Sequence, residues 1–189
     1  MDYEWTKPNG DVVKLSRVFR RKNAPNEKKS ITVDNKDCFM LVIGGAGFLG
    51  LNLVEHILTK EWDVRVRIFD IRPPAGGILE HPRVEFKQGN ICELQDLVDA
   101  CENVHTIFHT ASPPEGRSRE LYLNVNVKGT NNVIEAAKKT GVKQLVFTST
   151  ASVVFDGKDI VNGDETLPYV TKYLDPYIET KIMVTLLYF

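Results

Sequence analysis

The chain has 189 residues, of which 42% are hydrophobic and 26% charged, and 24 Lys and Arg stand against 25 Asp and Glu. About one domain fits this length, and the composition is that of a globular protein, not of a disordered chain, a collagen or a coiled coil. A net charge of -1 argues against a protein that binds nucleic acid over its whole surface, and three cysteines at unrelated spacings predict neither a disulfide framework nor a metal site.

Residues 1–36 differ from the rest of the chain in charge and in apolar content. They hold nine Lys and Arg against five Asp and Glu and contain no long apolar run. Such a segment cannot bury enough apolar surface to offset the entropy lost on ordering, so we interpret it as a flexible basic arm. It also lacks the apolar core of a signal peptide, and no stretch reaches the ~20 apolar residues that cross a bilayer. The chain as written is therefore expected to be cytoplasmic.

Residues 37–189 carry hydrophobic patterns typical of alternating strands and helices, and we interpret them as one domain. The expected strands are 39–43, 64–70, 84–87, 104–109 and 144–148, and the expected helices are 51–58, 94–100, about 120–139 and one that begins near 175. This alternation predicts an α/β fold with a doubly wound parallel sheet, the Rossmann type, with helices on both faces.

The first expected strand ends in a glycine-rich turn. Gly44, Gly47 and Gly50 recur at every third position before the next helix, which allows a tight turn and close approach of a dinucleotide's pyrophosphate. Asp70 ends the second strand 20 residues after Gly50, as expected for a carboxylate that accepts a hydrogen bond from a ribose 2′-hydroxyl. Because a carboxylate there would repel a 2′-phosphate, the pattern favours NAD over NADP, although Arg72 nearby would soften that repulsion.

Tyr177 and Lys181 are spaced as i and i+4 on the last expected helix, so they share one face. A lysine ammonium beside a tyrosine hydroxyl favours the phenolate and is expected to lower the tyrosine pKa from about 10, which prepares it to exchange a proton with an alcohol or ketone. Several hydroxyl side chains in residues 148–152 follow the fifth strand, where ligands bind in open α/β sheets. They are either ordinary turn residues, or one of them orients the substrate oxygen beside Tyr177.

Taken together, these motifs resemble those of the extended short-chain dehydrogenase/reductase superfamily. Further matching segments are Gly89-Asn90-Ile91, His109-Thr110-Ala111-Ser112-Pro113, Asn126-x-x-Gly129-Thr130 and Thr148-Ser149-Thr150. Within the superfamily, the chain from about Asp37 to Lys181 is most similar to the 3β-hydroxysteroid dehydrogenase family, and in particular to its sterol-oxidising branch.

The resemblance implies an oxidoreductase of steroid biosynthesis that transfers a hydride from the 3β-hydroxyl of a sterol or steroid to NAD, with NADP less favoured. For a 4α-carboxysterol, loss of CO₂ would follow. It implies Tyr177 as the general acid/base, Lys181 as the residue that lowers its pKa and binds the nicotinamide ribose, and Thr150 in the position usually held by serine. The implied cofactor-binding residues, with no metal, are Gly44, Gly47, Phe48, Leu49, Gly50, Asp70, Asn90, Ile91, Thr110, Ala111, Ser112, Asn126, Tyr177 and Lys181.

Two alternatives stay open from the residues alone. The glycine turn and the Tyr-Lys pair also suit another extended short-chain enzyme, such as a sugar-nucleotide epimerase or an aldehyde or flavonoid reductase, or a protein that binds NAD without turnover. Family members continue well beyond Lys181, so the resemblance implies a C-terminally truncated chain with an incomplete sheet and sterol pocket, which we expect to be poorly active and to associate. It further implies a homodimer, and attachment of the full-length family to the endoplasmic reticulum membrane or lipid droplet surface.

Overall fold

The computed structural model describes residues 38–60, 64–164 and 166–188, and the backbone of two short strands near the N-terminus. Those strands, β1 (Tyr3–Thr6) and β2 (Val12–Leu15), pair antiparallel as a small separate sheet. The other residues of the expected basic arm lie outside the described part of the chain.

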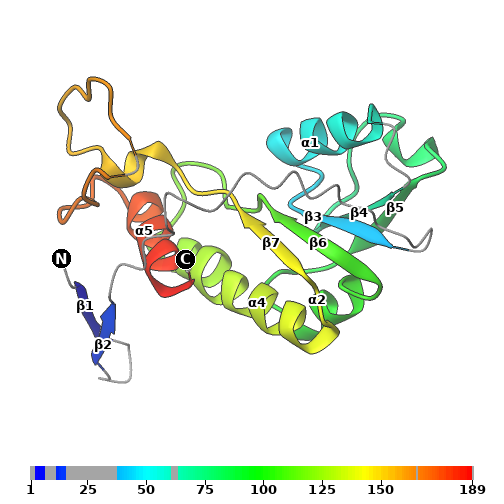
Figure 1. Cartoon of the computed structure of the whole chain (residues 1–189), viewed down its shortest axis with the longest axis horizontal. Coiled ribbons are helices and arrows are strands. Elements are labelled where there is room, and N and C mark those ends of the chain that lie inside the picture. Colours follow the sequence, from blue (N-terminus) through cyan, green and yellow to red (C-terminus); the bar gives the residue numbers. More distant parts are fainter. Residues whose placement is uncertain (1–2, 7–11, 16–37, 61–63, 165, 189) are drawn as a thin grey trace, which may run out of the picture.

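Five parallel strands form the main sheet, and the predicted doubly wound class is confirmed (Figure 1). In spatial order the strands are β5 (Val84–Gln88), β4 (Arg65–Asp70), β3 (Phe39–Ile43), β6 (Val104–His109) and β7 (Gln144–Phe147). The chain thus builds outward from β3 through β4 and β5, then returns to the other side of β3 for β6 and β7. Such a reversal opens a crevice beyond the carboxyl ends of the strands, where ligands bind in this class of sheet.

The strand register places those carboxyl ends at one edge. Ile43 of β3 lies opposite Phe69 on one side and His109 on the other, and His109 lies opposite Phe147. The segments that follow β3, β4, β6 and β7 therefore emerge side by side, although up to about a hundred residues of chain separate them.

Helices cover both faces of this sheet (Figure 1). One face carries α1 (Phe48–Leu58), and the other carries α2 (Leu94–Ala100) and α4 (Gly129–Thr140). Alternate residues of β3 divide between the faces: Phe39, Leu41 and Ile43 pack in the cluster that contains α2 and α4, while Met40 and Val42 pack in the cluster that contains α1. A strand buried on both faces reads as a continuous apolar run, which is why this segment is apolar throughout.

The long helix expected over 120–139 is interrupted. It consists of α3 (Arg119–Tyr122), a π-helical turn η2 (Leu123–Lys128) and α4, and it ends at Gly141, whose φ is +75°. The end at Gly141 agrees with the prediction, because a left-handed glycine satisfies the last helical carbonyls. The π turn was not predicted; it contains Asn126, and such turns are frequent at functional sites.

The last helix, α5 (Pro176–Tyr188), packs on the segment that follows β7. Val153, Val170, Ile178 and Ile182 form a third buried cluster there. Val153 belongs to η3 (Ala151–Val154), a short 3₁₀ helix, and its carbonyl accepts the N–H of Val170 at 3.0 Å. This small core fixes α5 against the end of β7.

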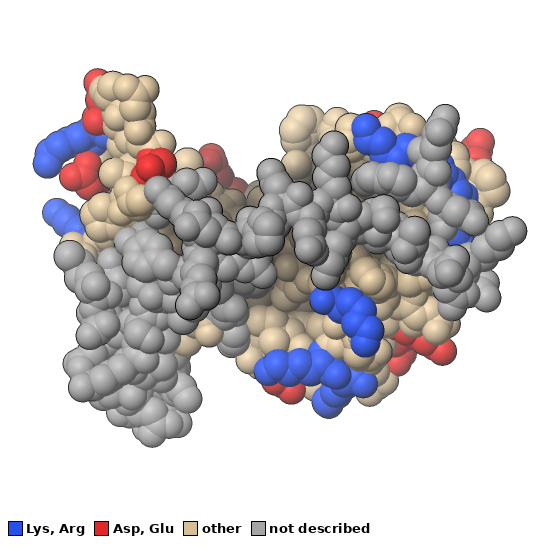
Figure 2. Space-filling view, in the orientation of Figure 1, with Lys and Arg blue, Asp and Glu red and all other residues tan. Residues whose placement is uncertain are grey.

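Two surface properties complete the fold. Over the described part of the face shown in Figure 2, Lys and Arg side chains lie in separate groups with acidic side chains between them. None of the helices in the described residues combines the length and the apolar character that a membrane span requires.

Candidate functional site

The glycine turn between β3 and α1 has no room for a side chain at Gly44 or at Gly50. A Cβ on Gly44 would lie 2.7 Å from the backbone of Ala111, and the φ of Gly44 is +81°. A Cβ on Gly50 would overlap the carbonyl oxygen of Gly44. Glycine at these two positions is therefore a requirement of the fold itself.

Gly47 differs from the other two glycines. It is exposed, and a Cβ there would meet only the carbonyl oxygen of Gly44, at 3.2 Å. Its own N–H donates to that oxygen at 3.0 Å and closes the turn. Space is thus left open above Gly47, as close approach of a ligand backbone or phosphate would require.

The start of α1 is suited to an anion. Gly47 is its N-cap, and within the described residues no side chain caps the helix and no acidic residue lies in its first turn. The first-turn N–H groups lack intrahelical partners and, with the positive end of the helix dipole, favour a phosphate. Phe48 and Leu49 begin the helix and are 88% and 49% exposed, so they border this opening.

Asp70 lies beside the same turn. Its Oδ2 accepts the N–H of Ala46 at 3.1 Å and its Oδ1 accepts the N–H of Ile71 at 2.8 Å. An ionised carboxylate has about four acceptor sites, so two backbone bonds leave capacity for a ribose hydroxyl. The structure therefore gives Asp70 a second role, because it also holds the glycine turn to the end of β4.

The segment after β6 crosses the glycine turn on its other side. Thr110 donates from its hydroxyl to the carbonyl of Ile43 at 2.9 Å, and the backbone of Ala111 lies against Gly44. The hydroxyl oxygen of Ser112 is buried and has no partner among the described residues. A buried polar atom without a partner is costly, so Ser112 suits a crevice that receives a polar ligand.

Two of the residues expected to bind the cofactor, Asn90 and Ile91, differ in their exposure. Asn90 is exposed, and its Oδ1 accepts the N–H of Cys92 at 3.0 Å. Ile91 is 6% exposed and packs in the core under Gly129, while its carbonyl accepts the amide of Asn132 at 3.1 Å. The Ile91 side chain therefore packs α4 against the sheet. Of the two residues, Asn90 is the one whose side chain is accessible to a ligand.

Thr150 acts on Tyr177, so the two hydroxyl side chains lie near each other. Tyr177 is half-buried, near the start of α5, and Thr150 caps η3 by accepting the N–H of Ser152 at 3.2 Å, which is the role of an ordinary turn residue. Burial raises the pKa of Tyr177, and the charges of Asp175 and Glu115 add to this, while the neighbouring Thr150 hydroxyl lowers it. The net direction is upward, so the expected lowering of the Tyr177 pKa is wrong for this structure.

Lys181 explains that difference. It is 3% exposed, and its Nζ donates to the carbonyl of Thr148 at 2.9 Å. The same Nζ lies 5.7 Å from the centre of the Tyr177 ring and 4.8 Å from that of Phe147. Burial lowers the pKa of Lys181 to about 8. Its charge is thus placed beside the aromatic ring and tied to a backbone carbonyl instead of contacting the Tyr177 hydroxyl.

Three contacts that the sequence did not reveal hold α5 in place. Arg119 pairs with Glu179 through two hydrogen bonds of 2.8 and 2.6 Å. The rings of Tyr122 and Tyr177 lie 6.0 Å apart, and the buried amide of Asn126 donates to the hydroxyl of Thr180 at 2.9 Å. The first residue of each pair belongs to α3 or to the π turn, so these two segments orient the face of α5 that carries Tyr177 and Lys181.

Two buried polar groups lie close to this arrangement. Asn126 is 2% exposed, and its Oδ1 has no partner among the described residues, although its amide is bound. His109 is 1% exposed, and its Nε2 is paired with the hydroxyl of Thr130 at 2.9 Å. Burial, followed by the charge of Lys181, lowers the pKa of His109 to about 3, so the imidazole is neutral at physiological pH.

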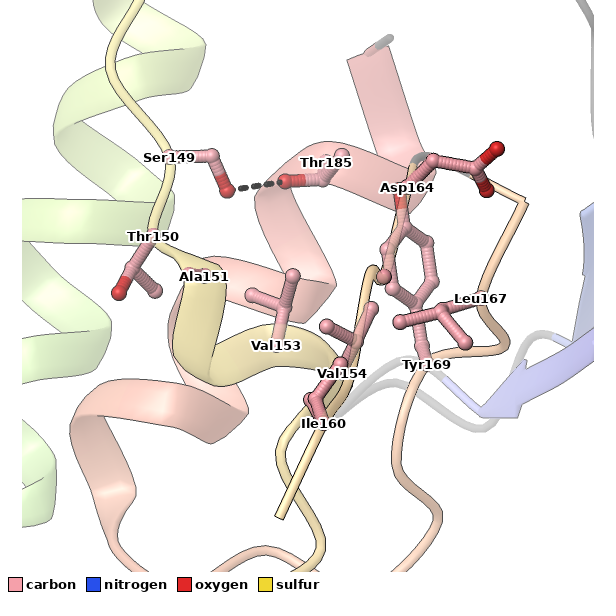
Figure 3. A pocket seen from close by; sticks show the side chains of 11 residues that line it. Ser149, Thr150, Ala151, Val153, Val154, Ile160, Asp164, Leu167, Tyr169 and Thr185 are labelled. Carbon is pink, nitrogen blue, oxygen red and sulfur yellow. Dashed lines mark hydrogen bonds between the residues drawn. The ribbon is translucent and has the colours of Figure 1, made fainter.

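A cavity of about 630 Å³ lies on the other side of η3 (Figure 3). Apolar side chains dominate its wall, and a hydrogen bond of 3.2 Å joins Ser149 to Thr185 at one end. Thr150 borders this cavity, but Figure 3 shows its side chain on the side away from Leu167 and Tyr169.

Comparison with known sequences adds to this geometry. Residues 41–186 match the family described as 3-beta hydroxysteroid dehydrogenase/isomerase. The chain is 50% identical over 143 residues to the sterol-4-alpha-carboxylate 3-dehydrogenase, decarboxylating, of Bos taurus, which covers 75% of this chain and 38% of the relative. It is 43% identical over 178 residues to the protein of that name from Homo sapiens, which covers 94% of this chain and 42% of the relative. The chain spans about two fifths of the length of these curated relatives.

A solved structure with the same fold is a short-chain dehydrogenase/reductase superfamily protein from Agrobacterium tumefaciens with bound NAD. The two chains superpose with a TM-score of 0.67 at 29% identity, over 78% of this chain and 43% of the other. The likeness supports a nicotinamide dinucleotide as the class of cofactor.

Proposed function

Because this chain belongs to the 3-beta hydroxysteroid dehydrogenase/isomerase family, we propose that it oxidises the 3β-hydroxyl of a sterol or steroid with a nicotinamide dinucleotide as hydride acceptor. The names of the relatives from Bos taurus and Homo sapiens favour a 4α-carboxysterol as the substrate. The observation that carries the proposal is the placement of Tyr177 beside Thr150 at the end of β7, with Lys181 buried 5.7 Å from the centre of the tyrosine ring.

The residues present fit a dinucleotide. Gly47 and the uncapped start of α1 would hold the pyrophosphate, and Asp70 would hold the ribose of the adenosine half. The unpartnered hydroxyl of Ser112 and the ammonium of Lys181 would face the nicotinamide half. When bound, the dinucleotide supplies the hydride acceptor and, in its oxidised ring, a positive charge.

Tyr177 and Thr150 would carry the proton chemistry. The Tyr177 phenolate takes the proton from the 3-hydroxyl while the hydrogen on C3 leaves as a hydride, and Thr150 holds the same oxygen by a hydrogen bond. The charge of Lys181, 5.7 Å from the tyrosine ring, favours the phenolate at long range. The raised pKa of Tyr177 means that this help is needed before the tyrosine can act as a base.

With a 4α-carboxysterol, oxidation would create a ketone next to the carbon that bears the carboxylate. The bond between C4 and the carboxylate carbon then breaks, CO₂ leaves, and the electron pair moves to the ketone oxygen. Hydrogen-bond donors at that oxygen stabilise the enolate until C4 takes up a proton. Tyr177 in its protonated form and Thr150 are the two donors at that position.

The test is a titration of the chain with NAD, followed by an assay of NAD reduction with a 3β-hydroxysterol, a 4α-carboxy-3β-hydroxysterol and a UDP-sugar. We expect saturable NAD binding and, in line with the low activity expected of this chain, slow NAD reduction with the sterols. Binding without reduction by any substrate would assign the chain to non-catalytic NAD binding. Interconversion of the UDP-sugar without net NAD reduction would assign it to the sugar-nucleotide epimerases instead.

A further inference from the structure

Ser152 extends the pair formed by Tyr177 and Thr150 into a row of three hydroxyl groups. The Oγ1 of Thr150 accepts the backbone N–H of Ser152 at 3.2 Å and donates to the Oγ of Ser152, also at 3.2 Å. Thr150 is also one of the groups that act on Tyr177. The proposed chemistry uses the first two hydroxyls and gives the third no role.

The hydroxyl of Ser152 lies next to that of Thr150, and Ser152 is not part of the cavity wall. Thr150 turns its side chain away from the far wall of the cavity (Figure 3). Ser152 is partly exposed. Ser152 accepts the proton of Thr150 in the structure and donates to no described residue, so its own proton is available to a ligand, also when Thr150 turns its hydroxyl to the substrate oxygen.

Building on the proposed function, we propose that Ser152 determines specificity by donating a hydrogen bond to the 4α-carboxylate of the sterol. The carboxylate is attached to the carbon next to C3, so its oxygens are close neighbours of the 3-oxygen held by Tyr177 and Thr150. A donor 3.2 Å from the Thr150 hydroxyl is within reach of such an oxygen.

Charge explains why a neutral donor suits this position. Asp175 and Glu115 both act on Tyr177, and each would repel a carboxylate, so its binding requires a specific donor. A guanidinium would bind the carboxylate more strongly, but it would also stabilise the negative charge there. Loss of CO₂ moves this charge to the ketone oxygen, so such stabilisation would oppose the reaction. A serine hydroxyl orients the carboxylate without neutralising it.

The experiment compares two substrates in one protein. The value of kcat/KM for NAD reduction is measured with 4α-carboxycholestanol and with cholestanol, which lacks the carboxylate, in the wild-type chain and in Ser152→Ala. The alanine variant keeps the backbone N–H that positions Thr150. We expect the ratio of the two kcat/KM values to fall by at least about tenfold, the smaller end of the effect of losing a hydrogen bond to a charged group.

Two further variants separate recognition from a change in the fold. Ser152→Thr keeps a hydroxyl and is expected to restore the ratio, whereas Ser149→Ala removes a hydroxyl that pairs with Thr185 and is expected to leave the ratio at the wild-type value. A wild-type ratio in Ser152→Ala would overturn the role of Ser152 while the proposed function stands. Failure of the wild-type chain to oxidise either sterol would instead overturn the proposed function, and the role of Ser152 with it.

Discussion

Tyr177 and Lys181 show how burial controls protonation at the scale of single residues. Desolvation raises the pKa of the tyrosine and lowers that of the lysine to about 8, because burial disfavours the charged form of each group. Their spacing on α5 places the ammonium near the ring but not at the hydroxyl. The hydroxyl environment therefore depends mainly on Thr150 and on neighbouring acidic groups.

Replacing Tyr177 by phenylalanine tests its role as the acid/base. The ring remains and can still pack against Tyr122, but the exchangeable proton is lost. We expect kcat for sterol oxidation to fall by about 10²–10⁴-fold, the usual contribution of general acid–base catalysis, with little change in the Kd for NAD. Turnover within about twofold of the wild type would remove Tyr177 from this role.

The raised pKa of Tyr177 predicts the pH dependence of the reaction. Oxidation needs the phenolate, so its rate should rise with pH and show no plateau below about pH 10, the ordinary value for tyrosine. Ketone reduction needs the protonated form and should stay constant over the same range. The groups that act on Tyr177 are Thr150, Asp175, Tyr122 and Glu115. Rate profiles in both directions test this, and a flat profile for oxidation would contradict it.

Asp70 is expected to select the cofactor. Its carboxylate would accept a ribose 2′-hydroxyl and repel a 2′-phosphate, so NAD should bind more tightly than NADP. In Asp70→Ala the ratio of the two dissociation constants should move toward one, measured by titration with each dinucleotide. Because Asp70 also accepts the N–H of Ala46, a fall in melting temperature should accompany the change. Equal affinity of the unmodified chain for both dinucleotides would disprove the selection.

At the scale of elements, the turn between β3 and α1 divides its glycines by task. Gly44 and Gly50 are required by close backbone contacts within the protein, whereas Gly47 faces open space. In the sequence the three glycines look alike, since they recur at every third position. Only the contacts with Ala111 and with the Gly44 carbonyl show which glycines the fold requires and which one is open to a ligand.

This division predicts two different phenotypes. Gly47→Val should abolish NAD binding with little loss of melting temperature, because its side chain would fill the space above the turn. Gly50→Ala should lower the free energy of unfolding by about 1–3 kcal/mol, as overpacking usually does. Gly77→Ala is the matched control, since its φ is -87° and its Cβ would lie 3.5 Å from Glu80. Normal NAD binding by Gly47→Val would show that the phosphates bind elsewhere.

At the scale of the whole molecule, Arg67 connects parts of the sheet to a helix. It lies on β4 at 7% exposure, and its Nε donates to the carboxylate of Glu85 at 2.9 Å. Its Nη1 donates to the carbonyls of Ala100 and Glu102, both at 2.7 Å, and the guanidinium stacks 4.0 Å from the centre of the Phe39 ring. The Arg67 side chain thus binds the carbonyl of Ala100 at the end of α2 and connects β4 with β5 and β3.

We expect Arg67→Ala to lower the free energy of unfolding by about 2–4 kcal/mol, because a buried and a part-buried carbonyl lose their donor and the Phe39 ring loses the nearer of its two guanidinium neighbours. Arg65 is the control: its side chain is 42% exposed and lies 3.9 Å from the same carboxylate. Arg65→Ala should cost less than about 1 kcal/mol. Chemical denaturation of both variants measures the difference, and similar losses would contradict a special role for Arg67.

Local sequence pattern alone predicted most of the main sheet and several residues of the candidate site. Apolar runs and helical spacing predicted the strands of the main sheet and their parallel direction, because each strand is buried on both faces and each helix on one. The glycine turn, Asp70 and the shared face of Tyr177 and Lys181 were also predicted from spacing, since period and turn geometry depend on neighbouring residues only.

Only the tertiary structure decided how those groups behave. Burial of Lys181 and its bond to Thr148, the tie between Asn126 and Thr180, and the packing of Ile91 under Gly129 all join segments far apart in the chain. The direction of the Tyr177 pKa follows from such contacts, because desolvation and nearby charge depend on the folded surroundings and not on spacing along the sequence.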